Sequence, residues 1–61
     1  MNLELVQAEV FDALGACDEL HAVLSGLKRL GLLTDEEDQE TKESIERISD
    51  TLRHKLPESA L

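Results

Sequence analysis

Apolar residues recur along the first half of the chain at alternating spacings of three and four. The set runs Leu3, Val6, Val10, Ala13, Cys17, Leu20, Leu24 and Leu27. These are the a and d positions of a heptad pattern, and they predict one long helix from about residue 3 to residue 30. Ala16, Val23 and Leu30 widen the apolar stripe on one side, as in helices that contact two neighbours.

The ends of this helix carry matching signals. Asn2 is a suitable N-cap, because its side-chain oxygen can accept from free amides of the first turn. Lys28 and Arg29 lie where the helix dipole favours cations, and Gly31 follows them where a left-handed cap needs a glycine. The first helix is therefore expected to end at the turn over residues 31–34.

A second helix is predicted from about residue 35 to residue 56. Thr34 and Glu37 form the T-x-x-E pattern of a capping box, so the acidic run that follows Thr34 marks a helix start. Ile45, Ile48 and Leu52 continue at a and d spacing, and Pro57 stops the helix. The tail, residues 57–61, is expected to be frayed.

Two helices joined by so short a turn fold back on each other as an antiparallel hairpin. With the turn near 32–33, the expected layers are Leu20 with Ile45, Cys17 with Ile48, and Ala13 with Leu52. Toward the turn the apolar residues of the first helix find polar residues opposite them. A single hairpin therefore leaves apolar surface in water.

The uncovered surface predicts a two-fold dimer that forms a four-helix bundle. Covering four leucine or valine side chains, at about 1.5 to 3 kcal/mol each, outweighs much of the net stability of a small domain. The residues predicted for the dimer interface are Val10, Cys17, Leu20, Val23, Leu24, Leu27, Leu30, Ile45, Ile48 and Leu52.

Composition leaves oligomerisation as the remaining way to stabilise so short a chain. The sequence has 61 residues and one cysteine, Cys17, so no internal disulfide can form. Structural zinc is not expected, because His21 and His54 lie far apart in sequence. The acidic run lacks the glycine and loop of an EF-hand, so calcium is not expected either.

The charge balance disfavours several kinds of partner. Fourteen acidic residues against six basic ones give a net charge of -8, which repels nucleic-acid backbones and anionic membranes. No apolar run approaches the roughly 20 residues of a membrane span, and the start lacks the features of a signal peptide. We expect a soluble, cytoplasmic protein that does not bind membranes, with nucleic acid a disfavoured partner.

No residue pattern indicates catalysis, a cofactor or a metal, so we do not expect an enzyme. A hairpin dimer offers no dry pocket for a nucleophile or an acid–base pair. Cys17 is interpreted as a small buried hydrophobe, with a redox or two-fold-axis disulfide role as the alternative. His21 is interpreted as a half-exposed filler, with a titrating pair across the dimer as the alternative.

Length, a single hairpin, a heptad core of small and large residues, and the acidic turn LTDEEDQE resemble the repressor-of-primer (Rop) family of plasmid replication control. The resemblance covers most of the chain and is architectural. It implies a dimeric four-helix bundle whose paired first helices bind RNA hairpins. Phe11 would be the aromatic residue on that surface, beside Gln7, Asp18 and Ser25.

Two classes of function fit the sequence. The first is a small acidic interaction protein that binds and regulates or inhibits another protein, of the kind encoded by phages, plasmids or toxin–antitoxin loci. The second is Rop-like RNA binding through the outer faces of the first helices. The predicted partner-binding residues, with a basic protein surface as the expected partner, are Leu5, Phe11, Leu32, Leu33, Asp35, Glu36 and Asp38.

Overall fold

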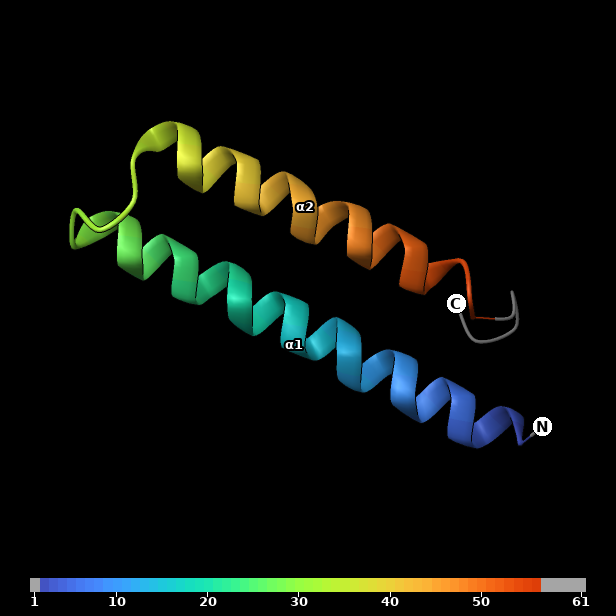
Figure 1. The fold of residues 1–61 in the computed structure, drawn as a ribbon. Coiled ribbons are helices and arrows are strands. Elements are labelled where there is room, and N and C mark those ends of the chain that lie inside the picture. Colours follow the sequence, from blue (N-terminus) through green and yellow to red (C-terminus); the bar gives the residue numbers. More distant parts are fainter. Residues whose placement is uncertain (1, 57–61) are drawn as a thin grey trace.

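Residues 2–56, the part of the chain described by this computed structural model, form two antiparallel helices (Figure 1). Helix α1 spans Leu3–Arg29 and helix α2 spans Asp35–Arg53. The molecule is a rod of 44 by 16 by 15 Å. The predicted all-α helical hairpin is confirmed, whereas the predicted frayed tail, residues 57–61, lies outside the described residues.

Both ends of α1 are closed by hydrogen bonds. The Asn2 side-chain oxygen accepts from the backbone amides of Glu4 at 3.0 Å and Leu5 at 3.3 Å. At the other end the amide of Leu32 donates to the carbonyl of Leu27, while Gly31 adopts a φ of 77°. This Schellman motif needs the left-handed conformation that glycine adopts without strain. It makes Leu30 the cap, so α1 ends one residue before the expected position.

A reciprocal capping box begins α2. The Thr34 hydroxyl accepts from the amide of Glu37, and the Glu37 carboxylate accepts from the amide of Thr34, each at 3.0 Å. The helix ends at Arg53, earlier than the expected residue 56, and a short turn over 54–56 follows. A residue before proline is disfavoured in helical conformation, which fits an end upstream of Pro57. Leu56 in this turn is buried.

The core between the helices is small and partly polar. Its buried apolar residues are Val10, Leu24, Ile45 and Leu56, and Asp38 and Ser49 are buried with them. Leu20 is 48 % exposed and Ile48 is 52 % exposed. The expected layers of Leu20 with Ile45 and Cys17 with Ile48 are therefore wrong for Leu20 and Ile48. Each helix is rotated so that one row of its predicted stripe faces inward, with Val10 and Leu24 on α1 and Ile45 on α2, while the other row turns outward.

The hairpin exposes more surface than a compact chain of its mass. The accessible surface is 4750 Å², against roughly 4,000 Å² expected for a globular monomer of this size. Among the described residues no large side chain is more than 98 % buried. A single copy therefore has a thin core and leaves apolar side chains in water.

Candidate functional site

Helix geometry sorts the side chains of the hairpin into two faces. Each residue turns a helix by about 100°, so Leu20 and Val23 lie about a quarter turn from the α1 stripe that meets α2. Ile48 lies about a quarter turn, in the same sense, from the inward Ile45 and Ser49 of α2. Because the helices are antiparallel, these two quarter turns point to the same side of the hairpin.

We name this side the apolar face and define it by Leu20, Val23, Leu27, Leu30 and Ile48. Leu27 is half-buried, and the other four residues are each about half to three-quarters exposed. A shallow groove of about 380 Å³ runs beside Ile48 and is lined by Ser44, Arg47, Thr51 and Leu52 as well. The apolar face thus spans both helices and is uncovered in the single chain.

A second groove lies between the helices on the other side, which we name the groove face. Its volume is about 530 Å³. The lining residues are Cys17, Asp18, His21 and Ala22 from α1, and Ile45, Glu46, Ser49, Asp50 and Arg53 from α2. The lining therefore combines a floor of small and apolar side chains with charged side chains from both helices.

Carboxylates dominate the electrostatics of this groove. Asp18, Glu46 and Asp50 line it, and among the lining residues that the structure describes Arg53 is the only arginine or lysine. The Arg53 guanidinium lies 3.1 Å from the carboxylate of Asp50, so its charge is already partnered within α2. The groove face consequently carries an excess of negative charge.

Ser49 is the buried polar residue of the groove face. It is 8 % exposed, and within residues 2–56 its hydroxyl makes no hydrogen bond. The other helix-interior serines and threonines each donate to the carbonyl four residues earlier: Ser25, Thr41, Ser44 and Thr51. Ser49 therefore differs from them in leaving its hydroxyl unpartnered at the groove.

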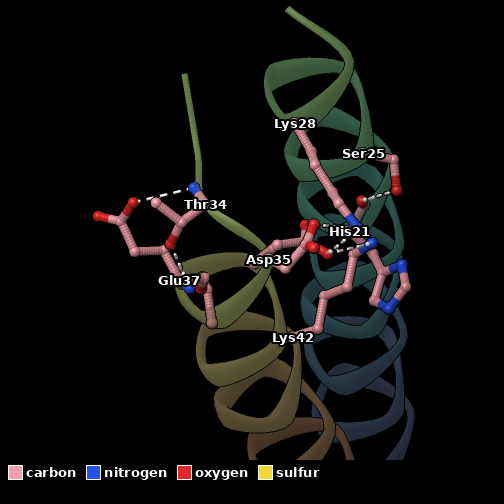
Figure 2. A network of polar contacts seen from close by, with 9 residues as sticks. His21, Ser25, Lys28, Thr34, Asp35, Glu37 and Lys42 are labelled. Atoms are coloured by element: carbon pink, nitrogen blue, oxygen red, sulfur yellow. Dashed lines mark hydrogen bonds and ion pairs between the residues drawn. The ribbon is translucent and has the colours of Figure 1, made fainter. Parts of the chain in front are cut away.

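Ion pairs tie the helices together near the turn. Figure 2 shows Lys28 reaching from α1 to the first turn of α2, where its ammonium lies 3.2 Å from Asp35. The same ammonium is 4.0 Å from Asp38, and Lys42 approaches Asp38 to 3.1 Å. The second carboxylate oxygen of Asp38 is buried and has no hydrogen-bond partner among the described residues.

The capping box also carries a shifted titration. The hydrogen bond from the Thr34 backbone amide, and after it one with the Thr34 side chain, hold the pKa of the Glu37 carboxyl below its ordinary value. A hydrogen bond to the ionised carboxylate favours the charged form, which is the cause of this direction. Glu37 is exposed, so the effect is local to the helix start (Figure 2).

Burial divides the residues predicted for the dimer interface. Val10, Leu24 and Ile45 are buried within the single hairpin, so they have little surface left for a second copy. Cys17 and Leu52 are half-buried. The remaining predicted interface residues are the five that define the apolar face.

The predicted partner-binding residues do not form one site. Leu5 and Phe11 are at least half exposed, and Leu5 lies in the first turns of α1, which extend beyond the end of α2 (Figure 1). Leu32 is exposed and Leu33 is half-buried in the turn. Asp35 and Glu36 are exposed, but Asp38 is 5 % exposed. The expected acidic rim is therefore wrong for Asp38, which is buried beside the ammonium groups of Lys28 and Lys42.

Sequence reasoning missed the polar residues that face inward on α2. Asp38, Lys42, Ile45, Ser49, Leu52 and Leu56 follow each other at spacings of four and three, which is a second heptad stripe beside the predicted one. That spacing was the available signal for the inward side of α2. It was missed because three of the six residues are polar, and the stripe was sought among apolar residues. Asp18, Glu46 and Asp50 carried no signal, since single acids on a helix surface are ordinary.

Cys17 and His21 are both half-buried and both line the groove face. Within residues 2–56, no three histidine, cysteine or carboxylate side chains come together in a way that could hold a metal ion. Neither α1 nor α2 carries an apolar stretch of the length that a membrane-spanning helix requires. Comparison with protein-family models, curated proteins and solved structures finds no match to this chain.

Proposed function

We propose that this protein is a non-enzymatic interaction protein that acts as a homodimer and binds and regulates another protein. The observation that carries the proposal is the exposed apolar face, which extends over both helices. Soluble monomers rarely leave a contiguous apolar patch of this kind uncovered. A second copy is the first occupant to consider, because a two-fold contact pairs the face with itself.

The dimensions of the hairpin are compatible with a dimer. One whole side of the hairpin measures 44 by 16 Å, which is of the same order as the roughly 800 Å² that each partner buries in a standard-size interface. Each fully covered leucine, isoleucine or valine contributes about 1.5 to 3 kcal/mol. Covering Leu20, Val23, Leu30 and Ile48 would therefore add several kcal/mol, which is comparable with the net unfolding free energy of a small domain.

The proposal assigns the protein no catalytic role. The groove face is open to water along its length, and it holds no pairing of a nucleophile with a base at hydrogen-bond distance among the described residues. General acid–base chemistry needs such a pairing in a site that excludes water. The free charges of the surface serve recognition in this proposal, not turnover.

A second candidate function is RNA binding through α1, which the resemblance to the Rop family implies. The observation in its favour is Phe11, an aromatic side chain that is 50 % exposed on α1. Asp18 lies two turns further along the same side of α1, where it repels phosphate. We therefore place this candidate second.

Light scattering coupled to gel filtration tests the dimer. At micromolar concentration the expected mass is twice the 6.8 kDa of the chain. A folded species with the mass of one chain would overturn the proposed assembly.

Partner binding is tested with two double variants, Leu5→Ser with Phe11→Ser and Leu32→Ser with Leu33→Ser. If both double variants bind a protein partner with unchanged affinity, the four substituted residues do not contribute to partner binding.

A further inference from the structure

We infer that the groove face binds a basic segment of a partner protein, with arginine or lysine side chains entering the groove and an apolar residue covering Phe11. This inference rests on the proposed protein-binding function, because it names the class of protein partner. Four features of the groove face carry it: its charge, its unpartnered hydroxyl, its floor and the position of Phe11.

The charge of the groove selects a cation. Asp18 on α1 and Glu46 and Asp50 on α2 line the groove from both sides, and the Arg53 guanidinium is occupied by Asp50 at 3.1 Å. A guanidinium or ammonium group placed between the helices meets carboxylates on two walls. Charge-assisted hydrogen bonds of this kind are about twice as strong as neutral ones.

Ser49 supplies an independent indication that a ligand enters this groove. Its side chain is 8 % exposed and lines the groove, and its hydroxyl has no partner within residues 2–56. Asp38 Oδ1, and not the Ser49 oxygen, is the described side-chain atom that is both fully buried and unpartnered, so the Ser49 oxygen is reached from the groove and is open to a donor from a ligand. The hydroxyl oxygen can accept from a guanidinium or ammonium N–H.

The floor of the groove suits the stem of a long basic side chain. Cys17, which is half-buried, and Ile45, which is buried, present small and apolar atoms to the groove. Arginine and lysine lay their methylene stems along such surfaces while the charged head reaches polar groups. The apolar floor therefore suits the methylene stem of arginine or lysine, and the carboxylates at the sides of the groove suit its charged head.

Phe11 makes a protein segment the fitting occupant. Seven residues, or two turns of about 10 Å in total, separate Phe11 from Asp18, so both point to the same side of α1. Phe11 is 50 % exposed. A free small cation cannot cover the ring and fill the groove together, whereas a peptide with one apolar and several basic residues can. Exposed aromatic residues beside charged rims are typical anchors of protein interfaces.

The test uses a short fluorescein-labelled peptide of arginine, leucine and alanine, with the same peptide carrying glutamate for arginine as its control. Fluorescence anisotropy on the full chain measures affinity. The groove variant is Asp18→Asn with Glu46→Gln. Its matched control is Glu19→Gln with Glu40→Gln, which removes the same charge from the same helices away from the groove. Circular dichroism checks that both variants are folded.

The arginine peptide is expected to bind saturably, and the glutamate peptide is not. The groove variant should weaken binding about tenfold and the control variant less than about twofold. Amide chemical shifts on peptide addition should change around Phe11, Asp18 and Ser49 and stay constant around Val23 and Ile48. The variant Phe11→Ser should also weaken binding.

Several outcomes would overturn the inference: equal losses in both charge variants, shift changes confined to the apolar face, no saturation up to about 1 mM peptide, or tighter binding of an RNA hairpin than of the peptide. Light scattering on the same samples separates the two proposals. A dimer that does not bind the peptide would overturn the groove inference and leave the proposed dimer intact. A monomer that binds the peptide through the groove supports this inference and removes the dimer.

Discussion

The apolar face and the groove face belong to the same two helices, yet they leave different groups without partners. On the apolar face, Leu20, Val23 and Ile48 are about half exposed. On the groove face, the groups without a partner among the described residues are the carboxylates of Asp18 and Glu46 and the hydroxyl of Ser49. Apolar area favours a lasting contact, while charge steers encounter and weakens with salt. The comparison suggests one face for assembly and the other for an exchangeable partner.

The largest expected effect comes from charging the apolar face. The double variant Val23→Lys with Ile48→Lys places two ammonium groups on the proposed dimer interface. We expect a loss of at least about 4 kcal/mol in association free energy, or about a thousandfold in Kd. Light scattering over a dilution series measures it.

The control for this variant is Ala8→Lys, because Ala8 is exposed on the side of α1 away from α2. It should leave the mass of the particle unchanged. If the double lysine variant keeps the mass of the parent, the apolar face is not the assembly surface. The proposed division of roles between the two faces would then be wrong for the apolar face.

A smaller effect distinguishes two isoleucines one turn apart on α2. Ile45 is 5 % exposed and Ile48 is 52 % exposed. Ile45→Ala should cost about 2 kcal/mol or more in unfolding free energy, as for other buried large-to-small changes. In a single hairpin Ile48→Ala should cost less than about 0.5 kcal/mol. In the dimer we expect it to cost about as much as Ile45→Ala.

Urea unfolding at several protein concentrations measures both isoleucine variants. The cost of Ile48→Ala should appear at concentrations where light scattering finds the dimer and fade on dilution. A small cost at every concentration would mean that Ile48 stays in water.

Local chemistry made both helix starts and the end of α1 predictable from sequence to within a residue, whereas the end of α2 and the rotation of the helices were not predictable. Asn2, Thr34 with Glu37, and Gly31 act through neighbours a few residues away, so their patterns are sufficient. A stripe wide enough for two neighbours does not say which edge meets which neighbour. Ile48 was therefore placed inside the hairpin, where the structure has Ser49.

Asp38 shows the same limit for charges. In sequence it is one of four acids in the first turn of α2, where the helix dipole favours acids. In the structure Asp38 is buried, and the ammonium of Lys28 on the other helix lies 4.0 Å from it, a neighbour that exists only after the chain has turned. The i,i+4 partner Lys42 could be found from sequence, but the combination of both lysines around one carboxylate could not.

A moderate effect is expected at the start of α2, which lies outside both faces. Thr34→Ala removes the hydroxyl that accepts from Glu37, and we expect a loss of about 1 kcal/mol. This should lower the melting temperature by about 4 to 8 °C for a domain of this size. Thr34→Ser retains the hydroxyl, and serine is also a favoured N-cap residue. Its melting temperature should therefore stay within about 2 °C of the parent.

Thermal melts followed by circular dichroism give the numbers for Thr34. Because the cap belongs to neither face, Thr34→Ala should leave the preference of the arginine peptide for the groove unchanged. Equal melting temperatures for parent and Thr34→Ala would show that the cap adds nothing to the helix start.

The smallest effect is the pH dependence of that cap. The pKa of Glu37 is lowered in the folded chain, so its contribution is present above the unfolded pKa of about 4.3 and is lost as the pH falls through the folded value. Glu37→Gln keeps a side chain that can complete a capping box without titrating. The difference in melting temperature between parent and variant should therefore shrink below about pH 4.

A pH-independent difference between these two proteins would contradict the role of the Glu37 carboxylate. The other acids of the chain are common to parent and variant, so they cancel in the comparison. Melts in a buffer series from neutral to acidic pH supply the data.

The short connection between Arg29 and Asp35 also governs how the molecule comes into being. Once the helices exist, closing a loop of a few residues takes on the order of 10 to 100 ns, and contacts between consecutive helices form early. Docking of α2 on α1 is then fast compared with the meeting of two chains, which is bimolecular. For a protein that assembles through its apolar face, the rate of reaching the native state therefore rises with its own concentration. For such an assembling protein, the rate at which the cell makes the chain would set the speed of maturation.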